Sequence, residues 1–133
     1  MARLSNRLIG NQLERDVAAK LSAHGYWVHL LTQSTVGQPA DMIAVKDRRA
    51  YLIDAKRCCG HTFEARRIED NQYMAMRSFQ ERGNGVGWFA IHFSSGPIYM
   101  VPLSTFTDRA HVSAQWCAEH AITIDEWAEA PAG

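Results

Sequence analysis

The spacing of apolar and polar positions predicts alternating helices and strands. Residues 6–23 place apolar side chains three and four positions apart, and the following His24-Gly25 is typical of a helix end. Short apolar or alternating runs predict strands over 26–31, 41–45, 50–56, 86–93 and 98–103. The two middle runs are separated by a polar break, and the last two by Ser94-Ser95-Gly96-Pro97, so each pair predicts a hairpin.

The rest of the chain predicts further helices. A second helix is expected from about Phe63 to Arg82, before Gly83-Asn84-Gly85. Residues 104–133 predict one or two short helices, with Thr123 as the N-cap of the last. The order helix, strand, hairpin, helix, hairpin and short helices predicts an α/β fold, a layered domain with a mixed sheet.

The first predicted hairpin carries two carboxylates. If Asp47-Arg48 forms a two-residue turn, Lys46 pairs with Arg49 and Asp41 lies opposite Asp54. Their side chains are then roughly 5 Å apart on one face, with Lys56 two positions further along that face. Like charges opposite each other destabilise a sheet unless they are neutralised, and a divalent cation can do so.

Each of the two long helices places one polar side chain within an apolar stripe. Glu14 is in helical register with Val17, Ala18 and Leu21. Gln72 has the same relation to the apolar positions Ile68, Ala75, Met76 and Phe79. A polar group that faces a core needs a partner, so we expect both side chains to converge on the hairpin carboxylates. A Glu14 that reaches water, or pairs with an Arg, is the alternative.

Length and charge refine this picture. A chain of 133 residues is expected to form a single domain, 1–133, with a core over about 6–107 and an acidic helical extension over 108–133. Residues 1–107 carry 13 Lys and Arg against 9 Asp and Glu, a net charge of +4, and the remainder carries −4. A basic body favours phosphate backbones, although an ordinary charged surface is the alternative. Candidate DNA contacts are Ser34, Thr35, Arg57, Arg66 and Arg67.

Two further features bear on location and metals. No apolar run approaches the length of a membrane span and the N-terminus lacks the apolar core of a signal peptide, so we expect a cytoplasmic protein without membrane contact. The three cysteines suggest no disulfide framework. A zinc site stays open as an alternative, although the spacing matches no known motif; its ligands would be Cys58, Cys59, His61, Cys117 and His120.

These motifs together resemble a known nuclease signature. Glu14, Pro39-Ala40-Asp41 and Asp54-Ala55-Lys56 are similar to the PD-(D/E)XK superfamily. The segments GNQLERDVAAKL, QPADMIAV and YLIDAK, with the later strands, are similar in order and spacing to RecU-type and archaeal Hjc-type Holliday junction resolvases over roughly residues 8–103.

The resemblance implies a restriction-endonuclease-like fold and a Mg²⁺-dependent endodeoxyribonuclease that nicks four-way DNA junctions symmetrically as a homodimer. Mn²⁺ can substitute for Mg²⁺ at such sites. The implied metal ligands are Asp41 and Asp54, with Glu14 directly or through water, and the backbone carbonyl of Ala55 is a further candidate. The implied catalytic residues are Glu14, Asp41, Asp54, Lys56 and Gln72.

The chain departs from the RecU pattern in ways that leave two alternatives. Residues 69–72 lack the His that RecU-type proteins often place beside the Gln, and the chain is shorter than RecU, so the stalk that RecU inserts into a junction is in doubt. The alternatives are another PD-(D/E)XK nuclease, of restriction or repair type, and a non-catalytic DNA-binding module.

Overall fold

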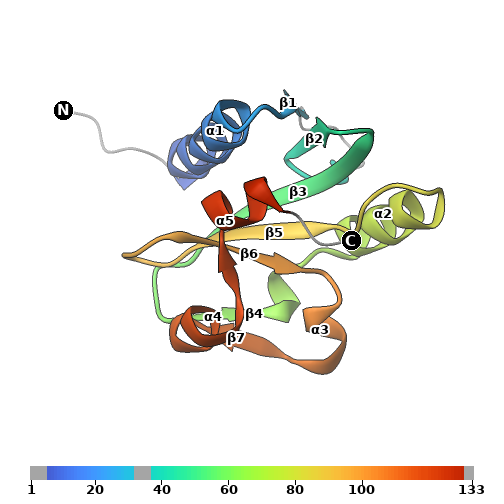
Figure 1. Ribbon diagram of the computed structural model, residues 1–133. Coiled ribbons are helices and arrows are strands. Elements are labelled where there is room, and N and C mark those ends of the chain that lie inside the picture. Colours follow the sequence, from blue (N-terminus) through green and yellow to red (C-terminus); the bar gives the residue numbers. More distant parts are fainter. Residues whose placement is uncertain (1–5, 32–36, 131–133) are drawn as a thin grey trace.

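A mixed sheet forms the centre of the molecule. The computed structural model describes residues 6–31 and 37–130, and within them six strands form one sheet in the order β1-β2-β3-β5-β6-β8 (Figure 1). β3 and β5 run parallel and the other neighbouring strands run antiparallel, so the predicted α/β fold with a mixed sheet is confirmed. The strands are β1 (Trp27–Leu30), β2 (Met42–Lys46), β3 (Arg49–Arg57), β5 (Trp88–His92), β6 (Ile98–Pro102) and β8 (Ile122–Thr123).

The hairpin of β2 and β3 has the predicted register. Lys46 pairs with Arg49, and the ladder continues to Met42 opposite Ile53. Asp47 and Arg48 have φ angles of 53° and 67°, which is the backbone of a type I′ turn. This turn matches the right-handed twist of the strands. Asp41 and Asp54 therefore lie next to each other just beyond the last pair of the ladder.

One face of the sheet is covered by α1 (Asn6–Ala23) and α5 (Ile124–Glu129) (Figure 1). Side chains alternate between the faces, so Tyr51 and Trp88 point to this side and Leu52 and Phe89 to the other. Trp127 of α5 is fully buried, with ring centroids 5.6 Å from Tyr26, 5.1 Å from Tyr51 and 5.5 Å from Trp88.

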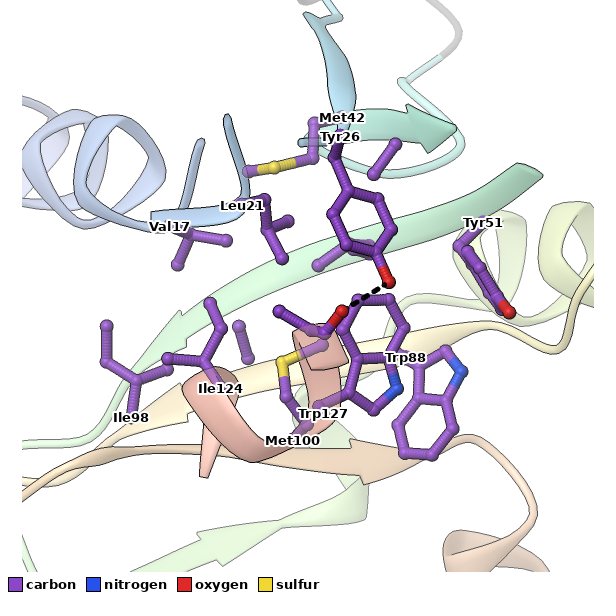
Figure 2. Close-up of a cluster of buried hydrophobic side chains, with 14 of the residues drawn as sticks. Val17, Leu21, Tyr26, Met42, Tyr51, Trp88, Ile98, Met100, Ile124 and Trp127 are labelled. Atoms are coloured by element: carbon purple, nitrogen blue, oxygen red, sulfur yellow. Dashed lines mark hydrogen bonds between the residues drawn. The ribbon is translucent and has the colours of Figure 1, made fainter. Parts of the chain in front are cut away.

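Figure 2 shows Trp127 among these rings, and the Tyr26 hydroxyl donates a hydrogen bond to the Ala128 carbonyl at 3.3 Å. The segment after residue 108 thus contributes to the core of this face. The division of the chain into a core and an extension stays a prediction.

The opposite face is covered by α2 (Asp70–Glu81) and by a smaller layer in the lower half of Figure 1. That layer pairs β4 (Thr62–Glu64) with β7 (His111–Ser113) and includes α3 (Thr105–Asp108) and α4 (Ala114–His120). Glu69 and Gln72 form a capping box that begins α2, and Thr123 caps α5 as predicted.

Two details differ from the sequence-based expectation. Phe63 lies in β4, and a 3₁₀ turn, η1 (Ala65–Arg67), precedes α2, so the predicted helix begins several residues later, at Asp70. The final segment, expected to be helical, also contains β7 and β8. Both errors involve strands of two or three residues that exist because of a distant partner: Phe63 pairs with Val112. No helix of the described ranges is long and apolar enough to cross a membrane.

Candidate active site

Asp41 and Asp54 meet where β2 separates from β3. The backbone of Asp41 still bridges its neighbours, because its N–H donates to the Ile53 carbonyl and its own carbonyl accepts from Leu31. Beyond this point the Asp41 side chain replaces a backbone carbonyl as the acceptor for β3: its Oδ2 accepts a hydrogen bond from the N–H of Ala55 at 2.7 Å. Asp41 is 6% exposed and Asp54 is 1% exposed, so both carboxylates are withdrawn from water.

Lys56 and Gln72 hold Asp54 from two sides. Lys56 Nζ lies 3.0 Å from Asp54 Oδ2, and Gln72 Nε2 donates to Asp54 Oδ1 at 3.0 Å. Gln72 Oε1 accepts from Lys56 Nζ at 3.3 Å and from the N–H of Glu69, so its amide has a defined orientation. Gln72 is 5% exposed, in agreement with its predicted place on the apolar stripe of α2.

Glu14 comes to the site from α1. Val17 and Leu21, one and two turns further along, are fully buried, so the predicted stripe is present and Glu14 lies at its end next to the site. Burial raises the pKa of Glu14, and the Asp54 charge raises this pKa further, while a hydrogen bond with Asp41 lowers it. The predicted convergence of Glu14 and Gln72 on the hairpin is therefore present.

The electrostatics of the pair are those of crowded carboxylates. Burial raises the pKa of Asp41 to about 8, the Asp54 and Glu14 charges raise it as well, and the hydrogen bond from Ala55 lowers it. Among the described residues, Lys56 is the one cation within ion-pair distance of these carboxylates. A further positive charge in the site would therefore stabilise the ionised form of each carboxylate.

The residues enclose a polar pocket of about 210 Å³. It brings together the five residues that the sequence predicted as catalytic and Ala55. Its lining consists of Glu14, Gly37, Gln38, Asp41, Asp54, Ala55, Lys56, Glu69 and Gln72. Gln38 and Glu69 were not predicted. Gln38 Nε2 donates to Asp41 Oδ1 at 2.7 Å, and Asn71 Nδ2 in turn donates to the Gln38 carbonyl at 3.0 Å. No local pattern in the sequence signals this contact, because it depends on how the loop before β2 folds.

The donor set fits a hard divalent cation. Mg²⁺ prefers oxygen ligands and keeps several waters, so one or two carboxylates are sufficient to bind it. The N–H of Ala55 points to Asp41, and the carbonyl of a strand residue points to the same side as its N–H, so the Ala55 carbonyl faces the site. Within the described part of the chain, no three His, Cys, Asp or Glu side chains are grouped to hold a metal. The site therefore fits Mg²⁺ with the carboxylates of Asp41 and Asp54 as its protein ligands and water in the remaining positions.

The zinc alternative gains no support from its five candidate ligands. Cys58 Sγ donates to the Thr62 carbonyl, Cys59 is exposed, and burial raises the pKa of Cys117 to about 11. Each of these cysteines is free.

The predicted DNA contacts are spread outside the pocket. Arg57, Arg66 and Arg67 are exposed, with Arg66 ion-paired to Glu64 and the Arg67 guanidinium 5.1 Å from the Phe63 ring. Ser34 and Thr35 lie outside the described residues.

The fold and the sequence each match known proteins. The structure is similar to that of Hjc, a Holliday junction resolvase from the archaeal hyperthermophile Archaeoglobus fulgidus, with a TM-score of 0.71, 16% identity, and coverage of 89% of this chain and 98% of that chain. No curated protein matches the sequence. The family model described as archaeal Holliday junction resolvase (Hjc) matches residues 5–132. With nearly the whole sequence matched and the nuclease signature gathered in one pocket, the chain belongs to the archaeal Holliday junction resolvase family.

Proposed function

We propose that this chain resolves four-way DNA junctions by Mg²⁺-dependent hydrolysis of phosphodiester bonds in the pocket around Asp41 and Asp54. The observation that carries the proposal is the pairing of these two buried carboxylates with Lys56 Nζ, 3.0 Å from Asp54 Oδ2, in a member of the resolvase family. The chemistry needs a nucleophilic water, relief of charge on the phosphate, and a proton for the leaving oxygen.

Asp41 and Asp54 are the proposed ligands of Mg²⁺, with the Ala55 carbonyl and Glu14 beside them. When bound there, Mg²⁺ would supply Lewis acidity toward the phosphate and would lower the pKa of a coordinated water. Mn²⁺ has the same preference for oxygen ligands and is expected to substitute.

Lys56 is the proposed group that stabilises the reacting phosphate. Its ammonium is a compact cation, which Asp54 and Gln72 hold at a fixed position on the pocket wall. From there it can donate hydrogen bonds to the attacking water or to a phosphate oxygen that gains charge. Gln72 touches no reacting atom in this scheme; it orients Lys56 and Asp54 together.

Symmetric cleavage requires two such pockets. A four-way junction has two-fold symmetry, and two matching nicks are most simply made by two copies of one site. We therefore expect a homodimer when the protein binds a junction, measurable by sedimentation of the complex.

Cleavage assays test the proposal. Labelled four-way junction, linear duplex and single strands are incubated with Mg²⁺ or with EDTA. We expect paired nicks in the junction alone, dependent on Mg²⁺. Asp54→Asn and Lys56→Ala should each lower the cleavage rate at least about 100-fold and retain junction binding, because they alter charge at the reacting phosphate.

The matched control is Asp47→Asn, which makes the same change at an exposed residue of the same hairpin and should leave cleavage unchanged. Full activity of Asp54→Asn or Lys56→Ala would reject the assigned site. Efficient cutting of duplex would indicate a restriction-type or repair nuclease, and tight binding without cleavage of any substrate would indicate a DNA-binding module.

A further inference from the structure

Two aromatic rings stand exposed on the outermost strand of the main sheet. Trp27 is 61% exposed, and His29 on the same face of β1 stacks with it at a centroid distance of 5.8 Å and an interplanar angle of 7°. Within the described residues, β1 pairs with β2 on one side and with no strand on the other. Two stacked rings exposed side by side form a small apolar surface that is available to a partner.

The ring pair shares a face of the sheet with the carboxylates. Val28 packs against the core that contains Val17 and Trp127, so by alternation Trp27 and His29 point to the opposite face, the face of Leu52 and Asp54. The register pairs His29 with Ile43 and Trp27 with Val45. From the usual spacing of strands and residues, the Cα atoms of His29 and Trp27 lie about 12 and 16 Å from that of Asp54.

The surface between the rings and the pocket suits a strand of DNA. On this face of β2, Ile43 and Val45 lie beside His29 and Trp27 and are apolar and partly buried, so β2 itself places no acidic side chain between the rings and the pocket. With a rise of 3.4 Å per nucleotide in duplex DNA, 16 Å corresponds to about five nucleotides, and to fewer in an unstacked strand.

We infer that Trp27, supported by His29, is a stacking platform for a nucleobase exposed at the branch point of a junction. In continuous duplex both faces of every base are covered by its neighbours, so a protein ring finds no free face. At a branch point the stack of base pairs is interrupted, and an aromatic ring can cover the base that becomes exposed. The platform would thereby select branched DNA, which deepens the proposed function and rests on it.

Binding measurements with three variants of β1 test the inference. Trp27→Ala should raise the Kd for a four-way junction about tenfold in EDTA and change the Kd for a duplex arm by less than about twofold. Trp27→Phe should restore most of the junction affinity, because a phenyl ring also stacks. Leu30→Ala is the matched control, as Leu30 is a partly exposed apolar residue of the same strand on the other face, and it should bind as the wild type does.

Fluorescence reports the contact directly. Trp27 is the exposed one of the four tryptophans, so junction binding should quench the tryptophan emission of the wild type but not of Trp27→Phe. A 2-aminopurine at the branch point should change its emission on binding wild type and not on binding Trp27→Ala, whereas the same base within an arm should not respond to either.

Three results would overturn the inference: unchanged junction affinity of Trp27→Ala, an equal loss for duplex and junction, or a change in oligomeric state in sedimentation. The last would assign the ring pair to contact with a second copy of the chain. A wild-type protein that neither binds nor cuts junctions would instead reject the proposed function.

Discussion

The side-chain amide of Gln72 connects the charged groups of the pocket through hydrogen bonds. Its Nε2 donates to Asp54 and its Oε1 accepts from Lys56 and from the N–H of Glu69, so one side chain is part of the helix cap and of the carboxylate pocket. The start of α2 and the position of Lys56 are thereby coupled. Neither a carboxylate nor an apolar side chain at this position could make both kinds of contact.

Glu14 is expected to destabilise the metal-free protein. The charge of Asp54 repels that of Glu14, and Glu14→Gln removes this repulsion while keeping the shape of the side chain. In EDTA we expect the free energy of unfolding to rise by about 0.5–1 kcal/mol. Mg²⁺ should raise the melting temperature of the wild type more than that of the variant, because the ion relieves a repulsion that the variant lacks.

Chemical and thermal denaturation measure this effect, with Glu119→Gln on the exposed surface of α4 as the control, expected to stay within about 0.5 kcal/mol of the wild type. A less stable Glu14→Gln protein in EDTA would mean that Glu14 is held by a favourable partner instead.

Most site residues were predictable, because each breaks a local pattern. Asp41 and Asp54 are charged positions in apolar strands, and Glu14 and Gln72 interrupt apolar helix stripes. Gln38 was not predicted, since its contact to Asp41 depends on how a loop of turn-forming residues folds back over the strand end. The roles of these residues in catalysis stay predictions.

The tight turn between β2 and β3 sets the position of the carboxylates, and its backbone is strained. Arg48 adopts a φ of 67°, a region that glycine occupies at low energetic cost. Arg48→Gly should therefore raise the free energy of unfolding by about 0.5–1 kcal/mol, without a loss of nuclease activity.

Gly96→Ala provides the opposite comparison. Gly96 has a φ of +90° and open space where a Cβ would lie, so alanine should lower stability by about 1 kcal/mol through backbone strain alone. Urea denaturation of both variants measures the two effects. A destabilised Arg48→Gly protein would show that the arginine side chain, and not the backbone, dominates at the turn.

Elements were predictable where the pattern is local. The position of the turn at Asp47-Arg48 and the helix end before Gly25 follow from a few adjacent residues. In contrast, β4 follows from a pairing of Phe63 with Val112 that no nearby residue indicates. Ile68 was assigned to the second helix from its helical spacing to Gln72, but it lies before α2, because the capping box at Glu69 begins the helix.

Trp127 of α5 packs against aromatic rings from three earlier parts of the chain, Tyr26, Tyr51 and Trp88. Trp127→Ala should lower the free energy of unfolding by about 3–5 kcal/mol, since a fully buried indole leaves a cavity among Tyr26, Tyr51 and Trp88. Trp27→Ala, which removes the same side chain from an exposed strand, should stay within about 0.5 kcal/mol of the wild type. Equal losses from the two substitutions in calorimetry would contradict the assignment of Trp127 to the core.

The packing of α5 against the core beneath α1 has a consequence for protein synthesis. A ribosome that stops before Ile124 releases a chain that contains all of the pocket residues but lacks α5, and α1 then has an apolar side without its cover. Such a fragment is expected to be recognised as misfolded and degraded. Incomplete copies are therefore not expected to fold stably enough to cut DNA.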